Sequence, residues 1–266
     1  MTGAAGGRRN ASDPVRAVVF DLDGVLVDSL AVAREAFVLA YAEVVGDGVA
    51  PVEEYCRHPG RYLPEVLALL GLPAAMAGPF VRESNRLAHR VTPVDGVVEL
   101  LGVLRGRGLG LAVATGRSGV RARDLLGALG LLSLVDHVVG ADEVARPKPA
   151  PDIVRRALEL LGVRPGEAVL LGDAPADLVS ARAAGVTPVA ALWGESDPDV
   201  LLAAGPDVVL SRLADLLPLC PPPGPGSPTG PTGGRSGAAT DTRGDRPAPL
   251  SGGPVPSDTP VRQPMG

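Results

Sequence analysis

Short apolar runs alternate with helical patterns along most of this chain of 266 residues. The apolar runs have the length and the aliphatic content of buried parallel strands, and they lie at Val15–Phe20, Leu109–Ala114, Ala168–Leu171 and Thr187–Leu192. The helical patterns lie at Gly96–Arg107, Ser118–Leu129, Pro151–Leu161 and Ala176–Ala184. This alternation predicts an α/β fold in which helices cover both faces of a parallel sheet.

One region breaks the alternation. Residues 30–93 contain no convincing strand, and their helical patterns lie at Ala31–Val45, Pro64–Leu70 and Phe80–Val91. We therefore predict an α-helical cap domain at 30–93, inserted into an α/β core formed by 15–29 and 94–220. The two connections, near Asp28–Leu30 and Thr92–Asp95, are the expected hinges of cap closure.

The two ends of the chain differ from this core. Residues 221–266 hold 12 Pro and 10 Gly with no aromatic residue, so they cannot bury enough apolar surface to offset the entropy of ordering. We predict a disordered Pro/Gly-rich tail there. Residues 1–14 form an N-terminal extension without an apolar run of signal-peptide or membrane-spanning length. These features predict a soluble cytoplasmic protein with no membrane partner.

Charge and cysteine content narrow the picture further. The net charge is −5, and it is about −6 without the tail, because the tail carries four Arg and three Asp. This balance predicts no nucleic-acid partner. The only cysteines, Cys56 and Cys220, lie far apart, so no disulfide framework is indicated and a reducing cytoplasm fits. No pattern in the sequence indicates an oligomeric state.

Polar residues follow three of the predicted strands at the point where each strand ends. Asp21 and Asp23 follow the first, Thr115 follows the second, and Asp173 follows the third. In parallel α/β sheets, ligands bind beyond the carboxyl ends of the strands, where loops from different strands converge. We therefore expect these side chains to share one site.

Carboxylates in this arrangement favour phosphoryl transfer assisted by a metal ion. A carboxylate attacks phosphorus only when charge is neutralised, and Mg²⁺ held by hard oxygen ligands such as Asp21 and Asp173 supplies this. Asp23 lies two residues after Asp21, on the same side of an extended chain, so Asp21 is the expected nucleophile and Asp23 the expected acid and base. Thr115 and Gly116 offer hydrogen-bond donors, and Lys148, the only Lys among 25 basic residues, offers a compact cation.

Four segments resemble the motifs of the haloacid dehalogenase-like superfamily. They are FDLDGVLVDS at Phe20–Ser29, Thr115 in AVATG, Lys148 in RPKPAPD, and GDAPAD at Gly172–Asp177. The resemblance implies a Rossmann-like core with a helical cap, and a catalytic set of Asp21, Asp23, Thr115 and Lys148. It also implies Mg²⁺ held by Asp21, Asp173 and the carbonyl of Asp23, with Asp177 supporting the metal.

Several activities are open to such a protein. A dehalogenase needs neither Asp23 nor Asp173, and a phosphonate-cleaving relative needs a cap lysine that residues 30–93 lack. The first hypothesis is a phosphatase that hydrolyses a small phosphorylated metabolite. A sugar-phosphate mutase with the same four motifs is the second, and a catalytically silent binding module is the third.

The substrate depends on the cap. The polar, Gly-containing stretch with Arg57, Gly60 and Arg61 lies where relatives place a substrate-specificity loop, so we expect it to bind substrate. As a whole, the chain is similar to phosphoglycolate-phosphatase-like enzymes. The segments AYAEVVGDG, EEYCRHPGRYLPEV and ALWGESD are similar to phosphatases encoded with 3-amino-5-hydroxybenzoate assembly in producers of ansamycin antibiotics. That similarity implies an amino-sugar phosphate or a sugar nucleotide as substrate.

Overall fold

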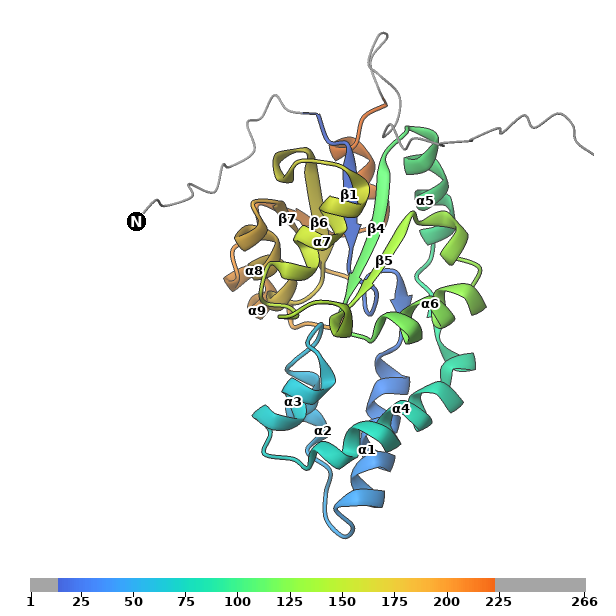
Figure 1. Cartoon of the computed structure of the whole chain (residues 1–266), viewed down its shortest axis with the longest axis vertical. Helices are drawn as coiled ribbons and strands as arrows, with labels where there is room; N and C mark the ends of the chain where they lie inside the picture. Colours follow the sequence, from blue (N-terminus) through green and yellow to red (C-terminus); the bar gives the residue numbers. More distant parts are fainter. Residues whose placement is uncertain (1–13, 223–266) are drawn as a thin grey trace, which may run out of the picture. The chain divides into compact units, whose positions relative to one another are not determined.

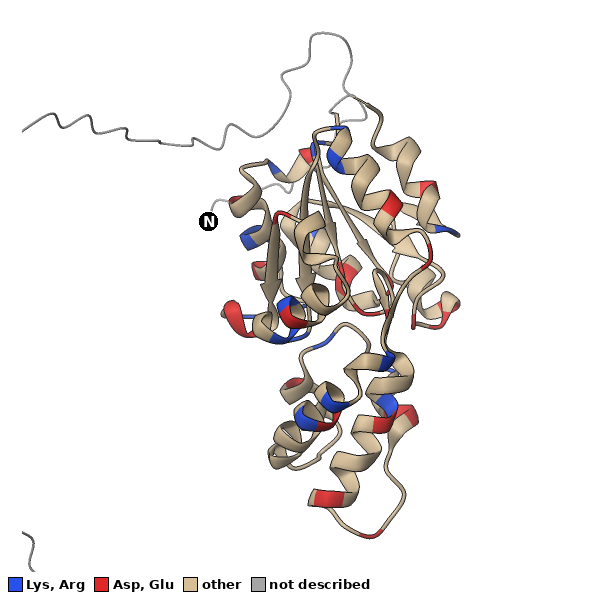
Figure 2. Ribbon diagram, turned by 90° about the vertical axis from the view of Figure 1, so that its right-hand side faces the viewer, with Lys and Arg blue, Asp and Glu red and all other residues tan. Residues whose placement is uncertain are grey.

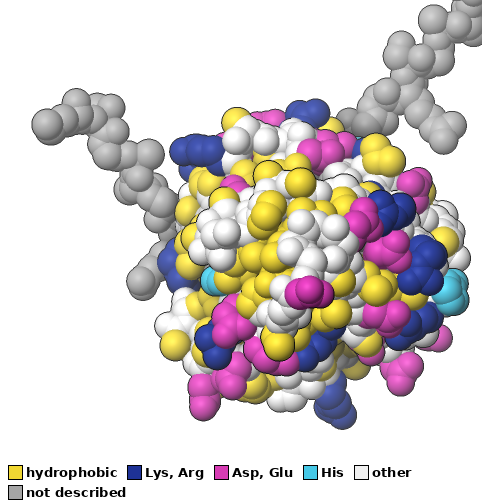
Figure 3. All heavy atoms as spheres, turned by 90° about the horizontal axis from the view of Figure 1, so that it is seen from below, with side chains coloured by type: hydrophobic (Ala, Val, Ile, Leu, Met, Phe, Trp, Pro, Cys, Tyr) yellow, Lys and Arg dark blue, Asp and Glu magenta, His cyan; other side chains and the backbone are white. Residues whose placement is uncertain are grey.

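A computed structural model describes residues 14–222 of the chain (Figure 1). The predicted N-terminal extension and the predicted tail lie outside the described residues, except for Pro14, Pro221 and Pro222. Within residues 14–222, no helix is both long enough and apolar enough to cross a membrane. Basic and acidic residues are interspersed over the ribbon (Figure 2), and on the face in Figure 3 both signs of charge lie side by side.

A six-stranded parallel sheet forms the core, as the alternating pattern predicted. Its strands, in spatial order, are β5 (His137–Gly140), β4 (Gly110–Thr115), β1 (Ala17–Phe20), β6 (Ala168–Gly172), β7 (Thr187–Ala191) and β8 (Val208–Leu210). In the central strand, Phe20 is in register with Val113 of β4 and with Leu171 of β6. The carboxyl ends of these three strands therefore lie level with one another.

Helices cover both faces of this sheet. Val18 and Phe20 of β1 pack in one apolar cluster with α5 (Val97–Gly106) and α6 (Gly119–Ala128). The alternate residues, Ala17 and Val19, pack on the opposite face with α7 (Asp152–Leu161) and α8 (Pro175–Ala184). Because successive strand residues point to opposite faces, this arrangement explains why β1 is apolar throughout.

The edge strands β5 and β8 and the short helix α9 (Pro198–Ala203) have no counterpart in the sequence prediction. Both edge strands are only partly buried, so they lack the continuous apolar run that identified the inner strands. Helix α9 is too short to show a full helical repeat.

Helices α1 (Leu30–Val44), α2 (Val52–Cys56), α3 (Leu63–Leu69) and α4 (Ala77–Arg86) occupy the inserted region, which we call the cap. The cap has its own apolar cluster, which contains Phe37, Met76 and Phe80. The sequence prediction did not include α2. It also extended the last helix to Val91, whereas α4 ends at Arg86 and a 3₁₀ turn (Ala88–Arg90) follows.

The two connections to the cap pair with each other. Strand β2 (Val27–Asp28) and strand β3 (Thr92–Pro93) form a two-residue antiparallel ribbon. The region 30–93, in which no strand was expected, thus includes β3, which is too short to leave a periodic signal. This ribbon brings the start and the end of the cap together beside the carboxyl end of β1.

Candidate active site

The polar residues predicted at the strand ends do converge. Asp21 directly follows β1, Thr115 is the last residue of β4, and Asp173 directly follows β6. These three strands are neighbours in the order β4, β1, β6. The site is therefore assembled by the register of the central strands.

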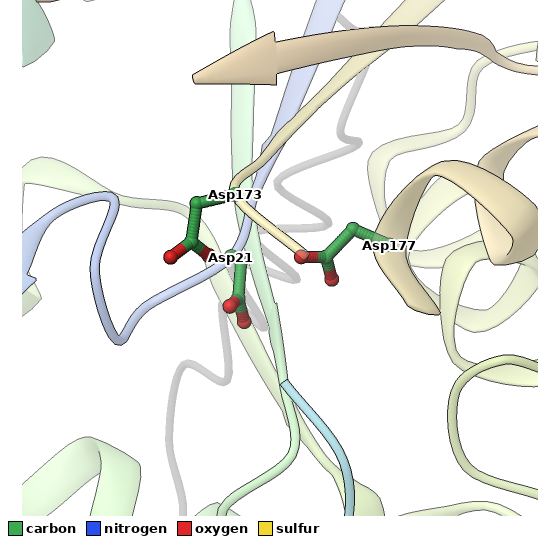
Figure 4. Close-up of side chains that lie close together, drawn as sticks. All are labelled: Asp21, Asp173 and Asp177. Atoms are coloured by element: carbon green, nitrogen blue, oxygen red, sulfur yellow. The ribbon is translucent and has the colours of Figure 1, made fainter. Parts of the chain in front are cut away.

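Three carboxyl groups form a buried cluster at this edge of the sheet. Oxygens of Asp21, Asp173 and Asp177 lie within 4.8 Å of one another, and each residue is at most 1% exposed (Figure 4). Asp177 lies in the first turn of α8, where its Oδ2 accepts a hydrogen bond from the backbone N–H of Ala174 at 3.1 Å. That bond holds the Asp177 carboxyl group toward the other two.

Lys148 is the cation of this cluster. Its Nζ donates hydrogen bonds to Oδ1 of Asp21 at 2.8 Å and to Oδ1 of Asp177 at 2.6 Å, and the residue is 1% exposed. Burial acts to lower the pKa of Lys148, but the charges of Asp177 and Asp21 outweigh it and raise the pKa above its usual value. Lys148 therefore remains charged and offsets one of the three carboxylates.

The remaining negative charge fits a divalent cation. Oδ2 of Asp21 and Oδ1 of Asp173 are buried and have no hydrogen-bond partner among the described residues. Burial, and then the charge of Asp177, raise the pKa of Asp21 to about 7 despite Lys148. Burial and the neighbouring carboxylates also raise the pKa of Asp173 well above its ordinary value. A hard cation such as Mg²⁺ beside these carboxyl groups would offset the excess charge and give the orphaned oxygen of Asp173 a partner.

Glycines leave the space that this cluster needs. Gly24 has a φ of +77°, and a Cβ atom there would lie 2.2 Å from Oδ2 of Asp173. A Cβ at Gly194 would lie 2.1 Å from Cβ of Asp173. Any larger residue at either position would therefore displace the Asp173 carboxyl group.

Asp23 lies beside the cluster, and its side chain has different partners. Arg117 donates from Nε to Oδ2 of Asp23 at 2.7 Å and from Nη2 to Oδ1 at 2.6 Å, and Ser29 Oγ also donates to Oδ1. Burial acts to raise the pKa of Asp23, but this bidentate pair with Arg117 outweighs it and holds the pKa below its usual value. Asp23 is therefore an anion in this arrangement, which is the form that accepts a proton.

The main chain orients Thr115, another of the expected catalytic residues. Thr115 is fully buried, and its Oγ1 accepts a hydrogen bond from the backbone N–H of Arg117 at 3.1 Å. The hydroxyl proton of Thr115 is thus left to donate. Gly116, the next residue, lines a pocket that begins at Asp21 and extends to the cap.

The cap forms the opposite wall of this pocket. Of the three cap residues predicted to bind substrate, Gly60 and Arg61 line the pocket, whereas Arg57 is exposed and is not among its lining residues. The loop containing Gly60 lies close to the core, because a Cβ atom at Gly116 would lie 2.5 Å from the carbonyl oxygen of Gly60. The pocket is thus narrow where cap and core meet.

Three charged residues that line the pocket were missed by the sequence prediction: Arg117, Arg121 and Glu195. Arg117 lies two residues after Thr115, and Arg121 lies one helical turn farther on. Glu195 lies in the loop that follows β7, so the strand-end rule that identified Thr115 also applied to it. Burial, and then the charge of Asp23, raise the pKa of Glu195 to about 8.

Comparisons with known proteins agree on a hydrolase. The family model of haloacid dehalogenase-like hydrolases matches residues 15–185. The chain is 33% identical over 221 residues to "Probable phosphatase IndB" of Dickeya dadantii, covering 75% of this chain and 91% of that protein. It is 35% identical over 198 residues to a phosphoglycolate phosphatase of Rhodospirillum rubrum, covering 68% and 81%. The crystal structure of a hydrolase from Pseudomonas syringae has a TM-score of 0.68 at 28% identity, covering 76% of this chain and 95% of that one.

Mg²⁺ is expected to stabilise the protein against unfolding. At a concentration one hundred times its Kd, a ligand of the folded state adds about 2.7 kcal/mol to the free energy of unfolding. Asp173→Asn should remove this gain and should also make the metal-free protein more stable, because it deletes a buried charge. The measurement is urea denaturation with MgCl₂ and with EDTA. Asp124→Asn, on the exposed side of α6, is the matched control.

The metal-free protein is also expected to lose stability as the pH rises. A carboxyl group whose pKa is raised by folding binds its proton more tightly in the folded state, so stability falls between its ordinary pKa near 4 and its raised value. Asp21, with a pKa of about 7, and Glu195, with a pKa of about 8, both have this sign. Denaturation in EDTA should show lower stability at pH 8 than at pH 6, and equal stability at the two values would contradict this charge balance.

Gly116→Ala is expected to push the cap loop away from the core. The added methyl group would meet the carbonyl oxygens of Gly60 and Arg61, which are backbone atoms that yield only if the loop moves. Hydrogen exchange of the amides in residues 57–61 should become faster, and KM should rise. Gly127→Ala in α6 is the control, since its Cβ would meet only a leucine methyl group at 3.9 Å. Unchanged exchange would show that the loop does not rest on Gly116.

Proposed function

This chain belongs to the haloacid dehalogenase-like hydrolase family, and from that premise we propose that it is a Mg²⁺-dependent phosphatase that hydrolyses a small phosphorylated metabolite through an aspartyl-phosphate on Asp21. Phosphatase activity itself follows from the family and from the named relatives. The geometry of Asp21 supports the finer proposal. One oxygen is held by Lys148, the other has no hydrogen-bond partner within residues 14–222, and the residue lines the pocket.

The first step is attack by Asp21. Its unpartnered Oδ2 forms a bond to phosphorus while the bond from phosphorus to the leaving oxygen breaks. Lys148 holds the other oxygen and keeps the carboxylate oriented. Asp21, Asp173 and Asp177 would hold Mg²⁺, whose positive charge would offset the charges of the carboxylate and the phosphate. The carbonyl oxygen of Asp23 remains a predicted fourth ligand of Mg²⁺.

Asp23 is proposed to transfer the protons, as general acid in the first step and as general base in the second. As an anion paired with Arg117, it is ready to take a proton from the water that hydrolyses the aspartyl-phosphate. Protonating the leaving oxygen in the first step requires the opposite form of Asp23. A phosphate oxygen of the substrate that draws Arg117 away would weaken this pair and allow Asp23 to carry that proton. Thr115 and Gly116 would supply donors to the transferring group.

The cap is proposed to select the substrate. Gly60 and Arg61 line the pocket, and Arg57 keeps its predicted role only if the cap loop moves. Two of the segments that resemble phosphatases of 3-amino-5-hydroxybenzoate assembly contribute to the pocket, through Tyr55 and through Glu195. This placement supports an amino-sugar phosphate or a sugar nucleotide as candidate substrates. Phosphoglycolate, named for one relative, is a third candidate.

Asp21→Asn is expected to abolish Mg²⁺-dependent phosphate release, because an amide cannot form the aspartyl-phosphate. Asp23→Asn should lower kcat by roughly 10²- to 10⁴-fold through loss of general acid and base catalysis. Asp124→Asn, an exposed carboxylate of α6 that does not line the pocket, should leave kcat unchanged. The measurement is phosphate release from a panel of phosphate esters and sugar nucleotides, with and without MgCl₂.

The outcomes separate the candidate functions. Release that persists in Asp21→Asn would refute the aspartyl-phosphate. Transfer of phosphate to a sugar hydroxyl instead of water would identify the mutase. No release and no transfer with any compound would favour the silent binding module.

A further inference from the structure

We propose that Arg121 binds a second anionic group on the leaving portion of the substrate, so that the enzyme selects phosphate esters that carry an additional carboxylate or phosphate. The inference rests on the proposed phosphatase function and names the substrate class of that same pocket. Arg121 lies on α6 and lines the pocket together with Asp21 and the cap.

The guanidinium of Arg121 is held in place by neutral groups. Its Nη2 donates to Oγ of Ser84 at 2.8 Å, its Nε donates to Oδ1 of Asn85 at 3.3 Å, and its Cζ lies 5.9 Å from the ring centroid of Phe80. All three partners belong to α4 of the cap. They orient the side chain without neutralising its charge.

Arg121 retains unused donors. Arginine has five N–H groups, and within residues 14–222 no hydrogen bond is formed by Nη1 of Arg121. No carboxylate forms an ion pair with Arg121 in that part of the chain. Burial, and then the charge of Arg117, lower the pKa of Arg121 to about 10, so the group is still a cation at neutral pH. The charge of Asp23 acts on Arg121 in the opposite direction, but the two side chains form no ion pair, so this half-buried cation keeps donors for an anionic ligand.

Two other cations of the site are already paired. Lys148 is shared by Asp21 and Asp177, and Arg117 is bound to Asp23. Arg121 is therefore in excess, as is Arg61 of the cap loop, which forms no ion pair within residues 14–222. The transferring phosphate must sit at Asp21, so the leaving portion of the substrate extends along the pocket toward the cap, where these two cations lie.

Matched pairs of phosphate esters test the inference. In each pair, a carboxylate replaces a neutral hydroxymethyl group: 2-phosphoglycolate against 2-hydroxyethyl phosphate, and 6-phosphogluconate against glucitol 6-phosphate. Calorimetry with MgCl₂ on the Asp21→Asn protein measures binding without turnover. At least one carboxylate should bind about tenfold more tightly than its partner, which is the size expected for a charged hydrogen bond.

Variants on that background assign the preference to Arg121. Arg121→Met should reduce it to within about twofold, and Arg121→Lys should retain part of it. Arg123→Met is the matched control on the same helix, because Arg123 is paired with Glu143 and does not line the pocket. Ser84→Ala deletes the hydrogen bond to the cap but keeps the cation, so it should leave the preference intact.

The outcomes are distinct. No preference in either pair, or a preference that survives Arg121→Met, would overturn the inference even if the enzyme releases phosphate. A preference lost equally in Ser84→Ala would also overturn it, since Arg121 would then act only as a latch between cap and core. If the preference depends on Arg121 but the native protein releases no phosphate from any ester, the proposed function fails and the inference stands.

Discussion

A single ammonium group is shared by two carboxyl groups in the interior of this protein, and a third carboxyl group lies against them. Lys148 donates to Asp21 and Asp177, and Asp173 completes the cluster. Three buried acidic groups with one cation leave an excess of negative charge, which burial makes unfavourable. That excess explains the raised pKa values of Asp21 and Asp173, and it makes the site suited to a divalent cation and then to a phosphate.

The same balance of charge extends outward from the cluster to the cap. Asp23 is kept anionic by Arg117, so the proposed nucleophile Asp21 and the proposed proton carrier Asp23 are bound to different cations although they are two residues apart. Beyond Arg117 there is an excess of positive charge, because the hydrogen bonds of Arg121 within residues 14–222 are made to neutral groups. The site thus has an acidic cluster, which is suited to a metal ion, and a basic residue near the cap, Arg121, which is suited to an anionic group of the substrate.

Much of the fold could be predicted from the hydrophobic pattern, and the omissions have a common cause. The inner strands β1, β4 and β6 are buried on both faces, so each appears as an uninterrupted apolar run. The edge strands β5 and β8 expose part of their residues, so they do not appear as apolar runs, and helix α9 is too short for a helical pattern to be recognised. The ribbon of β2 and β3 depends on pairing between residues more than 60 positions apart, which no local pattern encodes.

For the site, the sequence by itself determined which groups could act on a phosphate. Asp21, Thr115 and Asp173 each stand where a buried strand ends, and neighbouring parallel strands must bring such positions together. Only the tertiary structure decided which charges meet. The pairing of Arg117 with Asp23 and the neutral hydrogen-bond partners of Arg121 depend on how α6 and the cap pack around the pocket. Those contacts join distant segments through side-chain geometry, for which the order of residues along the chain carries no signal.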